Sequence, residues 1–520
     1  MTFPTRWFPP ALILALPLAA QADLDRAVER TRAAFNVPGI AVAVVQDGKV
    51  VLAKGYGVRR LGDPAPVTPR TLFAIASNTK IFTASALAML VDEGKLAWDD
   101  RVVDRLPGFQ MSDPYVTREM RIRDLLCHRS GLGLGAGDLM FFPPTDLTGE
   151  EIVHRLRFVP LATSFRSAYA YDNILYTVAG EVIRAVSGRP WAEFIRERFF
   201  GPLGMASSRT SIRDVRTGDD VAAAHAMDGD KLAPVEHDVM DNSAPAGAIV
   251  ASAEDLTRWV RALLAKGDLG GGRRLFSEKR ARELWTPLTL IPHGEPPAAL
   301  AEARSDFLAY AMGEDVRTYR GHLLVSHTGG LKGMVTEVSM VPGRNLGVIV
   351  LTNQEEGAAF KAVTNTVLDH YLGAPPKDWV AAFQEVRAAQ KARAKEEVAK
   401  AAGTRNAASK PALPLEGYAG RYRDPWYGDV LVEASGGKLA MRFTHTPGLS
   451  GTLEHWQYDT FVVRWKDRTL DADAYVTFSL DAAGKVARVA MKAVSPSTDF
   501  SYDFHDLALA PVAPGAPERW

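Results

Sequence analysis

Two groups of strand-like segments lie far apart in this chain, and the residues between them are mainly helical. The first group, residues 39–45 and 50–58, is joined by a tight turn and predicts a hairpin. The second group comprises residues 323–327, 335–341 and 346–352. Both groups can share one sheet only if the helical segment is inserted between them. We therefore predict an α+β fold: an antiparallel sheet flanked by helices and carrying a helical lobe.

A second, smaller domain is expected at the C-terminal end, because 520 residues exceed what one core usually holds. Residues 376–414 predict a linker, helical in its first part and flexible from Gly403 onwards. We expect a larger domain over residues 23–375 and an all-β, barrel-like domain over residues 415–513. Alternating apolar residues predict its strands within residues 417–424, 429–444, 452–465, 475–493 and 502–509.

The N-terminus has the pattern of a secretory signal peptide over residues 1–22. Arg6 precedes the apolar run 11–18, and Ala20-Gln21-Ala22 fits a cleavage site. The run is too short to cross a bilayer as a stable helix, so no membrane anchor is expected after cleavage. We predict a secreted, periplasmic protein, and an uncleaved N-terminal anchor is the alternative.

Charge and composition argue against several kinds of partner. Lys plus Arg and Asp plus Glu both total 61, so the net charge is zero and nucleic acid is not an expected partner. The 11 His and one Cys form no metal-binding motif, so neither a metal nor another cofactor is expected. Cys127, in an apolar segment, predicts a buried and inert thiol.

Ser77 and Lys80 form the first motif that carries chemistry, at the start of a helical run over residues 80–91. Their spacing puts both side chains on one face of the first turn, where free N–H groups favour a developing oxyanion. A lysine whose pKa is lowered by burial can accept the proton of a nucleophilic serine. Taken alone, the pair also fits a helix-capping serine beside an exposed lysine. The same spacing recurs at Ser435 and Lys438, where two intervening glycines predict an exposed hairpin tip.

Tyr171 and Asn173 form the second motif. The phenol can accept the proton of Ser77 and pass it to a leaving group, and the amide can hold a substrate amide. A partly buried aromatic residue followed by a turn is the alternative.

His327, Thr328, Gly329 and Gly330 form the third motif, at the expected end of a strand. Glycines there let a substrate backbone approach and pair with the strand edge. The N–H of Gly330 is a candidate oxyanion donor beside that of Ser77. A strand-ending turn that contains a hydrogen-bonded histidine is the alternative.

With these motifs in this order, the sequence resembles the beta-lactamase-related serine hydrolases. That family includes class C beta-lactamases, D-alanyl-D-alanine carboxypeptidases, D-aminopeptidases and esterases, and its pattern is Ser-x-x-Lys, Tyr-x-Asn and a Lys- or His-containing x-Thr-Gly strand. The resemblance covers about residues 25–373. It is also carried by the blocks at residues 73–80, 125–132, 169–176, 202–205 and 244–256.

The resemblance implies an acyl-enzyme on Ser77, with Lys80 and Tyr171 moving protons and with Asn173 and the 327–329 strand holding substrate. His327, where beta-lactamases more often have Lys, is similar to the carboxypeptidase, aminopeptidase and esterase branches. We therefore expect a peptidase or amidase acting on D-amino-acid-containing peptides. The alternatives are a carboxylic-ester hydrolase, a weak beta-lactamase, and a non-catalytic sensor that is acylated but not turned over.

Two features qualify this expectation. Asp172 stands where a small residue is usual, and inside the cleft it would disfavour anionic substrates and favour an amine. The C-terminal part resembles the lipocalin-like β domains of some relatives, which implies a role in substrate access, in assembly or in stability alone. A homo-oligomer is left open.

Overall fold

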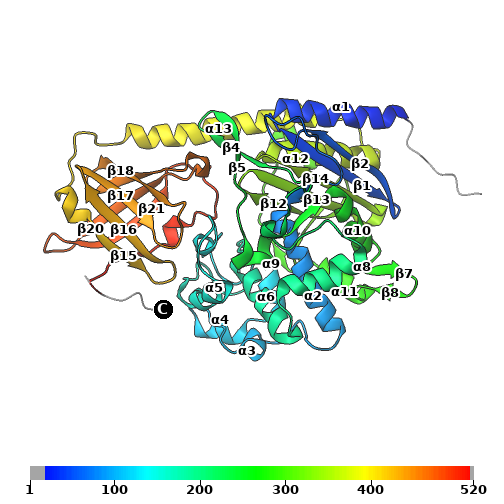
Figure 1. Cartoon of the computed structure of the whole chain (residues 1–520), viewed down its shortest axis with the longest axis horizontal. Coiled ribbons are helices and arrows are strands. Elements are labelled where there is room, and N and C mark those ends of the chain that lie inside the picture. Colours follow the sequence, from blue (N-terminus) through cyan, green and yellow to red (C-terminus); the bar gives the residue numbers. More distant parts are fainter. Residues whose placement is uncertain (1–17, 514, 516–520) are drawn as a thin grey trace, which may run out of the picture.

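The computed structural model describes residues 18–513 and 515, and it contains the expected central sheet (Figure 1). The strand order is β2-β1-β14-β13-β12-β11-β10-β9, and all neighbouring strands are antiparallel. The hairpin and the three later strands predicted from the sequence are therefore confirmed as parts of one sheet. The bounds are β1 Gly39–Gln46, β2 Lys49–Gly57, β9 Thr289–Leu290, β10 Leu308–Tyr310, β11 Asp315–Tyr319, β12 His322–Leu331, β13 Met334–Val341 and β14 Leu346–Thr352.

The middle strands are apolar on both faces because helices cover both sides of the sheet. Ala41 and Ala43 of β1 belong to a core that includes helix α10 (Ala253–Leu264). Val42 and Val44 belong to a second core, with α1 (Leu18–Ala34) and α12 (Gly357–Leu372). The alternation along one strand thus separates two hydrophobic cores.

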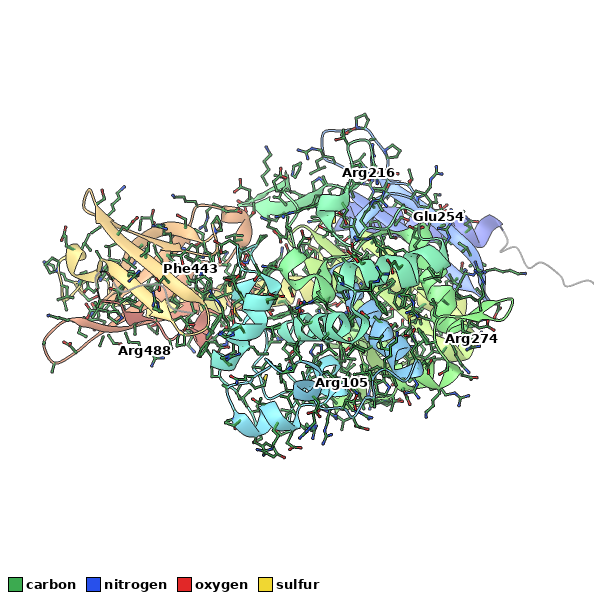
Figure 2. The ribbon with its side chains drawn as sticks, turned by 60° about the horizontal axis from the view of Figure 1, so that its bottom comes forward. Arg105, Arg216, Glu254, Arg274, Phe443 and Arg488 are labelled. Carbon is green, nitrogen blue, oxygen red and sulfur yellow. The ribbon has the colours of Figure 1, made fainter. Side chains whose placement is uncertain are left out.

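The helical lobe lies between β2 and β9 in the chain, as predicted. Its central helix, α2 (Lys80–Asp92), is buried along nearly its whole length, which explains why its sequence is apolar all round. It packs against α6 (Ile174–Ser187) and α9 (Ala244–Gly247). Figure 2 labels Arg105 and Arg274, two exposed side chains of the helical lobe. The lobe also contains α3 Val102–Arg105, α4 Pro114–Glu119, α5 Gly149–Arg155, α7 Trp191–Ile195, α8 Gly201–Leu203 and α11 Glu278–Leu284.

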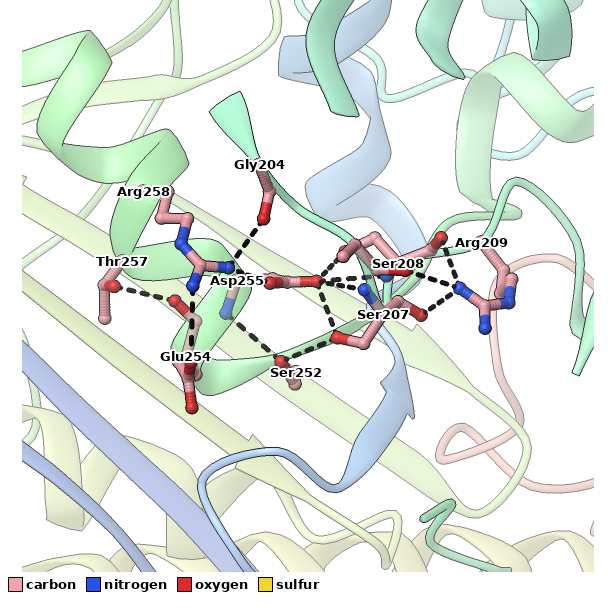
Figure 3. A network of polar contacts seen from close by, with 10 residues as sticks. Gly204, Ser207, Ser208, Arg209, Ser252, Glu254, Asp255, Thr257 and Arg258 are labelled. Atoms are coloured by element: carbon pink, nitrogen blue, oxygen red, sulfur yellow. Dashed lines mark hydrogen bonds and ion pairs between the residues drawn. The ribbon is translucent and has the colours of Figure 1, made fainter. Parts of the chain in front are cut away.

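A network around Asp255 joins the loop after α8 to the start of α10 (Figure 3). One oxygen of Asp255, Oδ2, accepts hydrogen bonds from the backbone N–H of Ser207 and Ser208, both at 3.0 Å, and from their hydroxyls at 2.6 and 2.9 Å. Ser252 caps α10 by accepting from the N–H of Asp255 at 3.1 Å. The network therefore connects the segment just after residues 202–205 to the block 244–256.

The C-terminal part is a nearly closed antiparallel barrel with strand order β21-β20-β19-β18-β17-β16-β15-β22. Aromatic side chains such as the buried Phe443 fill its interior (Figure 2). The strand predicted within residues 502–509 is wrong. Phe504, Leu507 and Leu509 are buried around a 3₁₀ turn, η12 (Phe504–Asp506), instead of alternating along a strand. The bounds are β15 Gly420–Asp424, β16 Gly428–Ser435, β17 Lys438–Phe443, β18 Ser450–Gln457, β19 Thr460–Trp465, β20 Ala474–Leu480, β21 Val486–Ala493 and β22 Ala510–Pro511.

Helix α13 (Trp379–Gly403) runs along the top of Figure 1 and connects the larger domain to the barrel. The segment after it, which the sequence predicts to be flexible, is held against the barrel. Arg405 donates to the carbonyl of Trp456 at 2.6 Å, and the N–H of Asn406 donates to Gln457 at 2.8 Å. Composition alone does not reveal these contacts, because their partners lie about fifty residues away.

The expected signal peptide lies mostly outside the described residues, since α1 begins at Leu18. Secretion therefore stays a prediction. Within residues 18–513 and 515, no helix has the length and apolar character needed to cross a membrane.

Candidate active site

Ser77 lies in a tight turn, the 3₁₀ helix η1 (Ala76–Thr79), which runs directly into α2. The preceding residue, Ala76, has a φ of 48°, a left-handed conformation that is strained for a residue with a Cβ and is typical of functional turns. The turn is braced by Asn78, which donates to the hydroxyl of Thr336 at 2.9 Å. This geometry leaves the Ser77 side chain half-buried at the wall of a cavity.

Lys80 is fully buried behind Ser77, and its amine has three hydrogen-bond acceptors. Nζ donates to Ser77 Oγ at 3.0 Å, to Asn173 Oδ1 at 2.7 Å and to the carbonyl of Ala246 at 3.0 Å. Burial lowers the pKa of Lys80 to about 7, although the charges of Asp138 and Asp172 oppose the shift. A neutral amine beside the serine hydroxyl can therefore accept its proton at physiological pH.

Tyr171 lies beside this pair, with the Lys80 amine 4.9 Å from its ring centroid. Burial raises the pKa of its phenol well above the usual range, and an interaction with Ser77 acts in the opposite direction. The phenol is therefore protonated at neutral pH and is suited to donating a proton.

Asn173 is positioned by a carboxylate that the sequence analysis missed. Its Nδ2 donates to Asp138 Oδ2 at 2.8 Å, and Ser501 of the barrel donates to the same oxygen at 2.8 Å. Burial raises the pKa of Asp138 to about 8, while both hydrogen bonds oppose that shift. Asp138 follows a glycine-rich loop and begins the 3₁₀ helix η3 (Asp138–Met140), and no local pattern distinguishes it from a turn residue.

His327 lies inside β12, because pairing with β13 continues to Leu331. The strand extends beyond the predicted residues 323–327, but residues 327–330 lie at its C-terminal end as predicted, and they have a free edge because β11 pairs with β12 only as far as Ser326. Nδ1 of His327 contacts the carbonyl of Thr328, which requires that nitrogen to carry the hydrogen. Nε2 then accepts from the hydroxyl of Tyr310 at 2.8 Å.

The same histidine is uncharged at neutral pH. Burial, with help from the nearby Lys80 charge, lowers the pKa of His327 to about 3. A neutral ring with both nitrogens engaged is a weak anchor for a carboxylate.

Gly329 and Gly330 complete the free edge of β12. A Cβ on Gly329 would lie 2.2 Å from the carbonyl oxygen of Ile75, so only glycine allows β12 to approach the nucleophile turn this closely. Gly330 is exposed and also lines the cavity.

All the predicted site residues except Lys80, which lies behind Ser77, line one cavity of about 370 Å³. Three carboxylates also line it: Asp315, Glu355 and, from the barrel, Asp499. Among the described lining residues there is no Lys or Arg. Asp172 does not contribute, since its side chain is buried against Ser130, whose hydroxyl lies 3.2 Å away. The acidic character expected from Asp172 therefore comes from other residues.

The beta-lactamase model matches residues 24–372. The chain belongs to the beta-lactamase family. A second model, a domain of unknown function (DUF3471), matches residues 404–511. The family has the beta-lactamase fold of serine hydrolases. Within the described residues, no group of three or more His, Cys, Asp or Glu side chains could hold a metal ion.

Relatives of this beta-lactamase-family chain include a fungal hydrolase and prokaryotic proteins of known structure. Unguisins hydrolase ungD of Aspergillus violaceofuscus is 29% identical over 474 residues, covering 84% of this chain and 82% of that protein. The octameric penicillin-binding protein homologue of Pyrococcus abyssi has a TM-score of 0.61 at 22% identity, covering 91% of this chain and 98% of its own. The D-amino acid amidase of Ochrobactrum anthropi SV3, complexed with L-phenylalanine, has a TM-score of 0.55 at 22% identity, covering 70% of this chain and 99% of its own. The two structural likenesses show the shared fold.

Proposed function

We propose that this member of the beta-lactamase family is a secreted, periplasmic peptidase or amidase that forms an acyl-enzyme on Ser77. The observation that carries the proposal is the buried Lys80 amine, 3.0 Å from Ser77 Oγ, with its pKa lowered to about 7. Lys80 takes the Ser77 proton as Oγ attacks the substrate carbonyl. The N–H groups of Ser77 and Gly330 stabilise the oxyanion.

The leaving group departs with a proton from Tyr171, whose raised pKa keeps the phenol protonated until this step. The Lys80 ammonium returns its proton to the Tyr171 phenolate, and the neutral amine then takes a proton from the water that attacks the Ser77 ester. That proton passes to Ser77 Oγ as the acid departs, which restores the free hydroxyl. Asn173 and the free edge of β12 hold the substrate amide and backbone.

The charge of the cavity supports a substrate without a carboxylate near the reacting bond. The lining has three acidic side chains and, among its described residues, no Lys or Arg, and His327 is neutral. Burial raises the pKa of Asp315 to about 6 and that of Glu355 to about 7, so Glu355 is only partly ionised at neutral pH. An ammonium or a neutral group therefore fits better than the carboxylate of a beta-lactam or of a peptide C-terminus. This favours a D-aminopeptidase or amidase over a carboxypeptidase.

The D-configuration is supported by resemblance. The D-amino acid amidase shares the fold. The fungal relative, named for the hydrolysis of unguisins, supports hydrolysis as the reaction. Because the cavity also suits uncharged substrates, a carboxylic-ester hydrolase is the second candidate. The octameric state of the Pyrococcus abyssi homologue supports testing this chain for homo-oligomers.

The test compares D- and L-aminoacyl amides, their N-acetylated forms, p-nitrophenyl esters and nitrocefin, with wild type and Ser77→Ala. We expect wild type to prefer D-aminoacyl amides with a free amine, and Ser77→Ala to lose about a thousandfold or more in kcat/KM. Ser435→Ala is the matched control, because Ser435 and Lys438 have the same spacing but face each other across a hairpin.

Each alternative has its own outcome. Full turnover by Ser77→Ala would exclude the acyl-enzyme, and a preference for L-aminoacyl or N-acetylated amides would exclude the substrate class. Rapid ester turnover without amidase activity would identify the protein as a carboxylic-ester hydrolase. An acyl-enzyme that persists for hours in intact-mass spectra would select the sensor.

A further inference from the structure

A loop of the barrel forms part of the active-site cavity. Asp499, Phe500 and Ser501, on the segment that follows β21, line the cavity together with Ser77. The Phe500 and Tyr171 rings meet edge to face, with centroids 5.8 Å apart. A Cβ on Gly135 would lie 2.6 Å from the Phe500 carbonyl oxygen, so the two backbones are in direct contact.

An unbroken chain of hydrogen bonds runs from this loop to the nucleophile. Ser501 Oγ donates to Asp138 Oδ2 at 2.8 Å, and Asn173 Nδ2 donates to the same oxygen at 2.8 Å. The other end of the Asn173 amide accepts from Lys80 at 2.7 Å, and Lys80 donates to Ser77 at 3.0 Å. Ser501 thus contacts the atom of Asp138 that fixes which way the Asn173 amide faces.

A second barrel residue holds the backbone at Asp138. The carboxylate of Asp503 accepts from the N–H of Gly137 at 2.6 Å and from that of Leu139 at 3.2 Å. Asp138 and Asp503 are both fully buried, and Oδ1 of Asp138 has no partner. Burial raises the pKa of both side chains, and two buried acidic groups this close are costly for stability unless their hydrogen-bond donors are placed well.

We propose that Ser501 and Asp503 are positioning residues for the hydrolase, acting through Asp138 and Asn173 on the amine of Lys80. The barrel therefore contributes positioning residues to the active site and is more than an appended stabilising module. This inference rests on the roles proposed above for Ser77 and Lys80.

The inference predicts a change in pH dependence as well as in rate. Removal of the Ser501 hydroxyl takes away a donor that favours the Asp138 carboxylate, so Asp138 becomes more protonated. Since the pKa of Asp138 is already about 8, the Lys80 ammonium loses only the residual charge of this group, and the acid limb of Ser77 reactivity moves slightly to lower pH. Lys80 and Asp138 face each other. The other titratable groups that face one or both of them are Asp172, Tyr171, Tyr176, His128, His327, Asp499 and Asp503.

The experiment measures the rate at which a fluorophosphonate probe labels Ser77 in the full chain, as a function of pH. We expect Ser501→Ala to label about tenfold more slowly on the plateau, with its acid limb at lower pH. Ser501→Thr, which keeps the hydroxyl, should recover most of the wild-type rate. Asp138→Asn, which keeps an acceptor but removes the charge, should move the acid limb in the same direction and further.

Ser497→Ala is the matched control, an exposed serine of the same loop, and it should behave as wild type. A folded Ser501→Ala with wild-type rate and acid limb would overturn the inference. If Ser501→Ala does not fold, Ser501→Cys, a similar volume with a weak donor, gives the same reading. Undiminished labelling of Ser77→Ala would instead refute the proposed function, so the two failures are distinguishable.

Discussion

The amine of Lys80 is closer to Asn173 than to Ser77: Nζ lies 2.7 Å from Asn173 Oδ1 and 3.0 Å from Ser77 Oγ. Asn173 therefore orients the base as well as any substrate. We expect Asn173→Ala to lower kcat about a hundredfold, because the amine then loses its shortest contact. Asn173→Asp keeps the acceptor but adds a carboxylate beside Lys80, so its acid limb should move to higher pH. An Asn173→Ala enzyme with wild-type kcat would contradict this role.

The activity should rise with pH through the pKa of Lys80, about 7. Below that value the amine is an ammonium and cannot accept the Ser77 proton, so kcat/KM should fall about tenfold per pH unit. Above it the amine is neutral and the profile should level off. Stopped-flow or fixed-time assays in a constant-ionic-strength buffer series measure the profile, and a flat profile between about pH 5 and about pH 9 would remove Lys80 from this role.

The same shift should appear in the pH dependence of stability. In the unfolded chain Lys80 has its ordinary pKa of 10.5, so between pH 7 and 10.5 the unfolded state binds a proton that the folded state does not. The free energy of unfolding should therefore gain a contribution that increases as pH rises through this window. Urea unfolding of wild type and of Lys80→Met isolates this contribution. The difference between their free energies of unfolding should change between about pH 7 and about pH 10. No change would show that the amine keeps its ordinary pKa.

Gly329 and Gly330 should differ sharply in their tolerance of a side chain. A Cβ at Gly329 would lie 2.2 Å from the Ile75 oxygen, whereas the nearest atom to one at Gly330 is 3.9 Å away. We expect Gly329→Ala to lower the free energy of unfolding by about 1–3 kcal/mol, and Gly330→Ala to change it little. Thermal or urea unfolding measures both, and equal stability of the two variants would contradict the close approach.

Asp255 should be far more important for stability than its neighbour Glu254 (Figure 3). Its removal leaves the buried N–H and hydroxyl of Ser208, among others, without an acceptor. We expect Asp255→Ala to cost about 2–4 kcal/mol. Glu254→Ala removes a side chain that is 43% exposed and should cost less than about 0.5 kcal/mol. Equal unfolding midpoints would argue against the network.

The single thiol should report on unfolding. Burial raises the pKa of Cys127 to about 12, so the native thiol is both inaccessible and protonated. We expect no alkylation by iodoacetamide in native protein and one adduct in denaturant, read by intact mass. Rapid native labelling would show that this segment opens.

Much of the fold follows from local patterns. The alternating and continuous apolar runs predict the strands of the sheet, and the apolar residues that follow Lys80 at helical spacing predict α2. The segment 502–509 failed because its buried residues, Phe504 and Leu507, are three apart around a turn. Tyr502 and Phe504, like Leu507 and Leu509, keep the two-residue spacing of a strand, and only the packing at the end of the barrel reveals the turn between the two pairs.

The sequence by itself determined the family, the nucleophile candidate Ser77 with its lysine three residues on, and the strand edge at Gly329, because each depends on residues that are close in the chain. Only the tertiary structure decided what sets the charge and orientation of Lys80. Asp138 meets Ser501 across 363 residues, and the acidic lining comes from three separate segments. Desolvation and hydrogen-bond partners depend on what folding brings into contact, and neither has a signature in residue spacing.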